Sequence, residues 1–132
     1  MSSHDSLLDL ASVLEDPYQL AIHLFNAQDW YAAHDAFEEL WHESEGHQRG
    51  LLQGIIQIAV AEHHLCGGNQ RGALLLMAEG LNHLVSCPLQ DVCFDLPSLM
   101  TVVQQRLTSL QAGRSPVDIP MPQLVQVVPN AA

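Results

Sequence analysis

One stretch of the sequence limits the fold more than any other: residues 48–66 are apolar on nearly every side of a helix. The apolar side chains are Leu51, Leu52, Ile55, Ile56, Ile58 and Val60. A helix that is apolar all round normally lies at the centre of a bundle. A membrane span needs about 20 predominantly apolar residues. This stretch is shorter and is interrupted by Gln53, Gln57, Glu62, His63 and His64. It therefore predicts a helix enclosed by other helices.

Four further helices are predicted around this central one. The ranges are 17–27, which begins at the capping pair Asp16 and Pro17, then 29–44, 70–85 and 95–111. The second of these carries an apolar stripe at helical spacing, formed by Trp30, Ala33, Phe37, Leu40 and Trp41. Strand signals are almost absent before the tail. The tail contains Pro116, Pro120, Pro122 and Pro129, which predict an extended segment.

The predicted fold class is therefore all-α, a compact bundle of about five helices with an extended, proline-containing C-terminal tail. Residues 29–41 align weakly with residues 69–81, at an offset that predicts two helical hairpins packed side by side. The predicted boundaries are an acidic N-terminal extension (1–15), one helical domain (16–112) and the tail (113–132). The tail either frays or packs on the bundle through Ile119, Met121, Leu124 and Val125.

The charge of the chain argues against two classes of partner. The formal net charge is −11 with histidines neutral, and all four basic residues are arginines scattered along the chain. Nucleic acids and anionic membrane surfaces need a cluster of positive charge, so neither is an expected partner. A cationic partner, a metal ion or a neutral ligand fits better, although the charge could serve solubility alone.

The N-terminus and the cysteines favour the cytoplasm. Residues 1–17 carry four acidic side chains and no basic region of the kind found in a signal peptide. The three cysteines, Cys66, Cys87 and Cys93, are expected to be buried free thiols, with a bridge between Cys87 and Cys93 as the alternative.

Polar residues of two predicted helices could converge between them. His34 and Glu38 are four residues apart and so lie on neighbouring turns of one face. Gln53, Gln57 and His64 fall within about 40° of one another on the helical wheel of the central helix. A short connection predicts antiparallel packing of these two helices, which would bring the two groups together, with Trp41 as a wall.

This polar set has three interpretations. It could be a buried hydrogen-bond network that fixes helix register. It could be a pocket for a small ligand or substrate, with His34 as base and Glu38 as its orienting partner. It could also hold a divalent metal through His34, Glu38 and His64. Whether the chain is an enzyme stays open: hydrolysis or proton transfer would suit these groups, but no residue selects a reaction.

Three runs of the sequence resemble a known family. They are NAQDWYAAHDAFEELW (26–41), RGLLQGIIQIAVAEHH (49–64) and GNQRGA (68–73). Together they are similar to domain-of-unknown-function family 309, whose pattern is A-H-[DE]-x-x-E-x-x-W followed by Q-G-[LI]-I-Q. The resemblance covers roughly residues 17–112. It implies a small helical bundle without an established function. The family's signature polar positions fall on His34, Asp35, Glu38, Trp41, Gln53, Gln57 and His64.

A second resemblance supports a different function. Residues 28–41 look like the helix junction of a tetratricopeptide repeat, with Trp30, Ala33, Phe37 and Leu40 in matching places. The internal offset departs from that repeat's roughly 34 residues. The alternative function is therefore a non-catalytic helical module that binds a protein partner, with the His/Glu/Gln set structural. A homodimer that completes the core of residues 48–66 is compatible with either function.

Overall fold

The computed structural model describes residues 15–89 and 92–127 and contains five α-helices. The helices are α2 (Pro17–Asn26), α3 (Trp30–His42), α4 (Gly46–Cys66), α5 (Gln70–Val85) and α6 (Leu96–Gln111). No strand occurs in the described ranges, where Phe94 and Gln126 form an isolated antiparallel bridge. The all-α prediction is confirmed. Apart from Glu15, the expected N-terminal extension lies outside the described residues, as do residues 128–132 of the tail.

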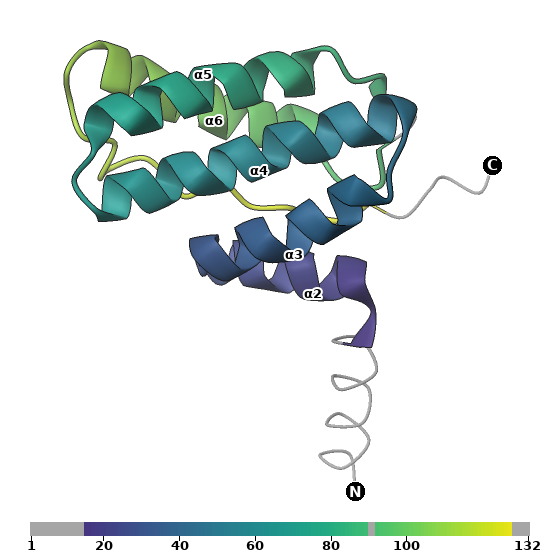
Figure 1. Cartoon of the computed structure of the whole chain (residues 1–132). Coiled ribbons are helices and arrows are strands. Elements are labelled where there is room, and N and C mark those ends of the chain that lie inside the picture. The colour runs from purple at the N-terminus through teal and green to yellow at the C-terminus, as the bar shows by residue number, and fades with distance from the viewer. Residues whose placement is uncertain (1–14, 90–91, 128–132) are drawn as a thin grey trace, which may run out of the picture.

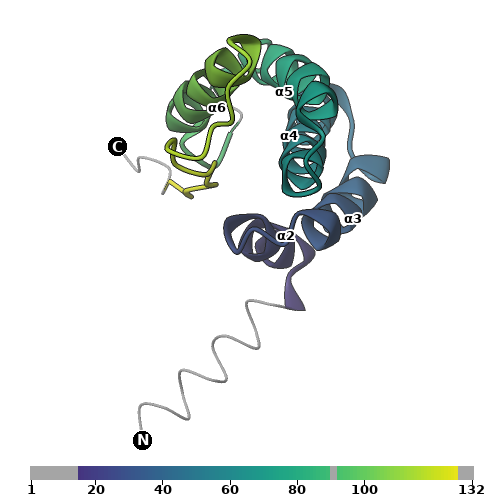
Figure 2. The same cartoon turned by 90° about the vertical axis from the view of Figure 1, so that its left-hand side faces the viewer.

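The helices pack in the order of the chain. Each one lies against the next, from α2 to α6, and Figure 1 shows α4 and α5 running side by side above the α2–α3 pair. Seen from the side, the helices follow an open curve, and the segment after α6 runs back toward α2 (Figure 2). The architecture is thus a stack of two hairpins, α2–α3 and α4–α5, completed by α6. No helix in the described part of the chain has the length and apolar character needed to cross a membrane.

The helix ends follow from local capping chemistry. An oxygen of Asp16 accepts hydrogen bonds from the backbone amides of Tyr18 and Gln19, and Pro17 occupies the first helical position. Asp95 starts α6 in the same way, and its hydrogen bonds from the Ser98 hydroxyl and backbone amide lower the pKa of its carboxyl group. One boundary differs from the prediction. The helix predicted over residues 48–66 begins two residues earlier, at Gly46, which has a φ of 60°.

The central helix α4 is enclosed as predicted. Leu51, Leu52, Ile55 and Ile58 are at most 2% exposed. All of this burial occurs within one chain, so the apolar character of α4 provides no argument for a homodimer. The internal repeat also has a structural counterpart. Its two copies fall on α3 and α5, the second helices of the two hairpins.

Two glycines let α4 and α5 approach closely. A methyl group added at Gly80 would meet the carbonyl oxygen of Gly54 at 2.9 Å, and one added at Gly54 would meet the carbonyl oxygen of Gly80 at the same distance. Backbone atoms cannot move aside as a flexible side chain can. The contact therefore fixes which face of α4 is turned toward α5, and Gln57 borders it, with its Cβ 3.3 Å from the added group at Gly80.

We predict opposite effects for alanine at two glycines that both lie within helices. Gly80→Ala should lower the free energy of unfolding by about 1–3 kcal/mol, because it overpacks the α4–α5 contact. Gly50→Ala should raise it by about 0.5–1 kcal/mol, because nothing lies within 4 Å of its added methyl group and alanine favours the helix. Urea denaturation of both variants tests this. Equal effects of the two substitutions would contradict the close helix contact.

Candidate functional site

His34 and Glu38 lie together on the surface of α3. The Nε2 atom of His34 is 3.0 Å from a carboxylate oxygen of Glu38, and its Nδ1 atom is 3.1 Å from a carboxylate oxygen of Asp35. A neutral imidazole has one N–H, so it donates to one carboxylate at a time, whereas the protonated ring donates to both. The three side chains are 28%, 45% and 60% exposed for His34, Glu38 and Asp35. The predicted pairing is present, but it faces solvent.

Trp41 lies in the last turn of α3, next to the connection to α4. The guanidinium carbon of Arg49 lies 3.7 Å from the centre of a Trp41 ring, as in a cation–π contact. Arg49 also donates to the carbonyl oxygen of Ser44, at 3.4 Å. The half-buried indole therefore helps to hold the α3–α4 connection.

Two of the three polar residues predicted on this face of α4 bond to partners outside α3. Gln57 donates to a carboxylate oxygen of Glu79 on α5 at 3.0 Å. The Nδ1 atom of His64 lies 3.3 Å from the side-chain amide nitrogen of Asn69, which belongs to the turn before α5. Gln53 is half-buried. For Gln57 and His64, the predicted convergence between α3 and α4 is therefore wrong. The helical wheel correctly grouped residues along α4, but it could not tell which neighbouring helix covers that group.

The adjacent histidine takes the place expected for His64. The ring of His63 lies 6.0 Å from the ring of Tyr31 on α3, centre to centre, and Tyr31 lies 6.3 Å from His34. His63, which the predicted polar set does not include, is exposed.

The proposed metal ligands do not gather either. In residues 15–89 and 92–127, no group of three or more His, Cys, Asp or Glu side chains could hold a metal ion. Because His64 is turned to Asn69, it does not join His34 and Glu38. The cysteines also differ in part from expectation: Cys66 and Cys93 are free thiols, but both are exposed.

The exposed side of α3 is strongly acidic. Asp35, Glu38, Glu39 and His42 line a shallow depression on it. Tyr31 is 64% exposed one turn before Asp35. We call these five residues the α3 acidic face. Carboxylates beside an exposed aromatic ring suit a cationic group, because the carboxylates attract it and the ring can stack on it.

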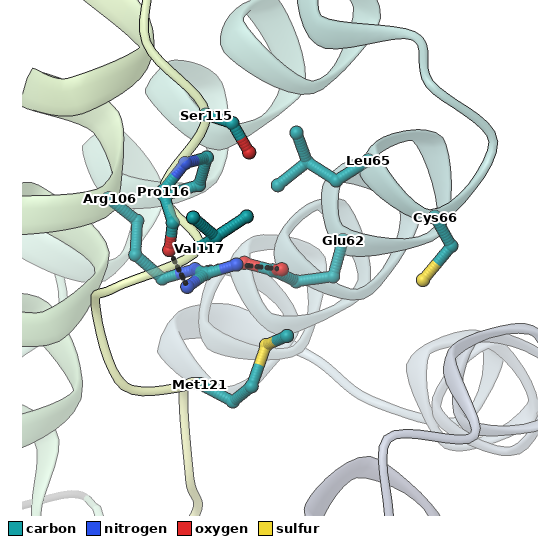
Figure 3. Close-up of a pocket in the computed structure, with 8 residues that line it drawn as sticks. All are labelled: Glu62, Leu65, Cys66, Arg106, Ser115, Pro116, Val117 and Met121. Carbon is teal, nitrogen blue, oxygen red and sulfur yellow. Dashed lines mark hydrogen bonds and ion pairs between the residues drawn. The ribbon is translucent and has the colours of Figure 1, made fainter.

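A buried ion pair that sequence reasoning missed links α4 to α6. Glu62 and Arg106 are 1% and 2% exposed. Arg106 donates from Nε to one carboxylate oxygen of Glu62 at 2.7 Å and from Nη2 to the other at 2.6 Å (Figure 3). Such a two-pronged contact fixes both distance and orientation.

Arg106 also holds the C-terminal segment. Its Nη1 atom donates to the carbonyl oxygens of Pro116 at 3.1 Å and Ile119 at 2.8 Å, with a longer contact to Pro120 at 3.4 Å. Further along, the side-chain amide of Asn26 on α2 bonds both the N–H and the carbonyl of Leu124. The described tail is therefore packed on the bundle. Of its predicted contacts, Leu124 is buried, but Val125 is 55% exposed.

The spacing of apolar residues could have revealed this pair. Leu51, Ile55 and Ile58 are followed at the same helical spacing by Glu62. On α6, Leu99, Val103 and Leu110 occupy the same register, with Arg106 in the missing place. A charge in a core stripe needs a partner of opposite sign, and the two interruptions have opposite signs.

Comparison with known proteins agrees with the resemblance drawn from the sequence. Residues 18–76 match the model of a family described as "Domain of unknown function (DUF309)". The matched range contains most of α2, all of α3 and α4, and the first part of α5. It includes the α3 acidic face and Glu62, but not Arg106 or the tail.

One curated relative is an "Uncharacterized protein" of Aquifex aeolicus (strain VF5), 24% identical over 97 residues. The alignment covers 73% of this chain and 29% of that protein, so the chain spans less than a third of the relative's length.

We predict that breaking the ion pair is costly. Glu62→Gln should lower the free energy of unfolding by about 3–5 kcal/mol, because it leaves the Arg106 charge buried without a carboxylate. The double variant Glu62→Leu/Arg106→Met should be more stable than Glu62→Gln, because no unpaired charge is left. Urea denaturation measures both, with Arg114→Met at an exposed arginine as control. A loss no larger than that of the control would show that the pair contributes little.

We also predict that His34 contributes little to stability. His34→Ala should change the free energy of unfolding by at most about 0.5 kcal/mol, because it removes only surface contacts. Phe37→Ala, on the same helix at a position 1% exposed, should cost about 3–5 kcal/mol. Thermal and urea unfolding of the two variants would compare them. If both variants lost a comparable amount of unfolding free energy, His34 would have a structural role.

Proposed function

We propose that this chain is a non-catalytic interaction module that binds a basic segment of a partner protein through the α3 acidic face. The observation that carries the proposal is the exposure of the polar residues on this helix. His34, Asp35 and Glu38 bond to one another at the surface instead of filling the core. Polar side chains that the core does not need are the ones available for recognition.

Electrostatics favours a cationic partner at this face. The chain carries fifteen acidic residues against four arginines, and the acidic side chains of the face are half-exposed or exposed. A concentrated negative surface accelerates encounter with a positively charged segment, and salt weakens the attraction.

Tyr31 supplies the apolar part of the contact. An exposed tyrosine offers a large rigid surface at small entropic cost and often contributes much of the binding energy at interfaces. Arginine stacking on an aromatic ring already occurs within this chain, where Arg49 covers Trp41. A partner arginine on Tyr31, with its guanidinium near Asp35, would repeat that chemistry.

The alternative, a ligand or substrate pocket centred on His34, has less support. It needs Gln53 and Gln57 as hydrogen-bond donors beside His34, whereas the Gln57 amide is engaged by Glu79. The packing of hairpins in chain order is also similar to the stacking in tetratricopeptide arrays, which act by binding. The proposal includes a reducing, cytoplasmic setting, which the free thiols of Cys66 and Cys93 support.

The test is selection of peptides from a random display library, followed by fluorescence anisotropy on the enriched sequences. We expect arginine- or lysine-containing peptides to be enriched and their affinity to fall by about tenfold in Asp35→Asn/Glu38→Gln. Raising the salt from about 0.05 M to about 0.5 M should weaken wild-type binding as well.

The matched control is Glu15→Gln/Asp118→Asn, which removes the same number of charges from exposed positions outside the face. Its affinity should stay close to that of the wild type. Equal losses in the two double variants would mean that net charge alone attracts the peptides. Failure to enrich any basic peptide would also refute the proposal.

A further inference from the structure

A cavity lies beside the buried ion pair, between the end of α4, α6 and the C-terminal segment (Figure 3). Its volume is about 200 Å³. It is lined by Glu62, Leu65, Cys66, Arg106, Ser115, Pro116, Val117 and Met121. We propose that this cavity binds a small neutral molecule with an apolar body and one hydrogen-bond acceptor.

The apolar side chains that line the cavity favour a ligand with an apolar body. Leu65, Pro116, Val117 and Met121 present mainly carbon and sulfur to the cavity. Val117 is 80% exposed, so a ligand seated beside it would remove apolar surface from water. Methionine adapts its shape to different partners, which suits Met121 to contact a ligand of variable outline.

The Arg106 guanidinium, which lines the cavity, explains why the ligand should carry one hydrogen-bond acceptor. A guanidinium has one N–H on Nε and two on each terminal nitrogen. Nε and one N–H of Nη2 bond to Glu62, and Nη1 bonds to the tail carbonyls. The second N–H of Nη2 has no acceptor among the residues that the structure describes. It can therefore donate to a carbonyl or ether oxygen of a ligand.

The Glu62–Arg106 ion pair disfavours charged ligands in this cavity. Glu62 already neutralises Arg106, so an anion would find no net positive charge there, and the chain as a whole is negative. Arg106 likewise neutralises the carboxylate of Glu62, so a cation would find no net negative charge at the ion pair. Bringing an uncompensated charge into this site would incur a desolvation cost that a neutral group avoids.

Three probes that share one ring and differ in charge test the proposal: cyclohexanone, cyclohexanecarboxylate and cyclohexylammonium. Each is titrated into the full chain labelled with ¹³C at the methionine methyl groups. We expect cyclohexanone to shift the Met121 signal saturably, with a dissociation constant on the order of 1 mM. The two charged probes should bind at least about tenfold more weakly. Met77, buried in the core, and Met100, on α6 in a different depression of the surface, serve as internal references.

Two substitutions on the C-terminal segment complete the design. Val117→Trp should fill the cavity and abolish the Met121 response, whereas Val127→Trp, at an exposed valine outside the cavity, should preserve it. An unchanged Met77 signal verifies the fold of each variant. The proposal is overturned by a non-saturable response of Met121 in the wild type, by equal shifts of Met100, by tighter binding of either charged probe, or by unchanged binding in folded Val117→Trp.

Discussion

The ion pair between Glu62 and Arg106 joins parts of the chain that lie far apart in sequence. Two charges removed from water are costly unless their hydrogen bonds are met, and here the carboxylate oxygens and the tail carbonyls meet nearly all of them. The tail has no helix of its own in residues 113–127, so its path depends on these contacts and on the amide of Asn26. One arginine thus connects α4, α6 and the segment that returns to α2.

The second constraint is the close approach of α4 and α5 at Gly54 and Gly80. It turns the Gln57 side of α4 toward α5, and this divides the polar residues that the sequence had grouped together. His34 and Glu38 pair on the surface of α3, whereas Gln57 contacts α5 and His64 contacts the turn before α5. The proposed recognition surface and the proposed cavity are therefore separate, and each can be tested without the other.

The family match covers all of the α3 acidic face but only part of the cavity. The matched residues 18–76 contain the whole α3 acidic face, so every residue proposed for recognition lies in the matched part of the chain. The cavity also needs Arg106 and the C-terminal segment, which lie beyond the match. Binding in the cavity is therefore expected to depend on how the tail packs, whereas binding at the face is not.

The sequence by itself determined the five helices, the cap of the first helix at Asp16, the central place of residues 48–66 and the pairing of His34 with Glu38. These features depend on local periodicity and on groups only a few residues apart. The sequence also places Glu62 and Arg106 at apolar-stripe positions of their two helices. Their pairing becomes evident only when the stripes of the two helices are compared. Only the tertiary structure decided that Gln57 meets Glu79, that His63 and not His64 meets Tyr31, and that the tail lies against Arg106. A helical wheel gives directions around one axis, whereas the neighbour in each direction is set by the packing of the whole chain.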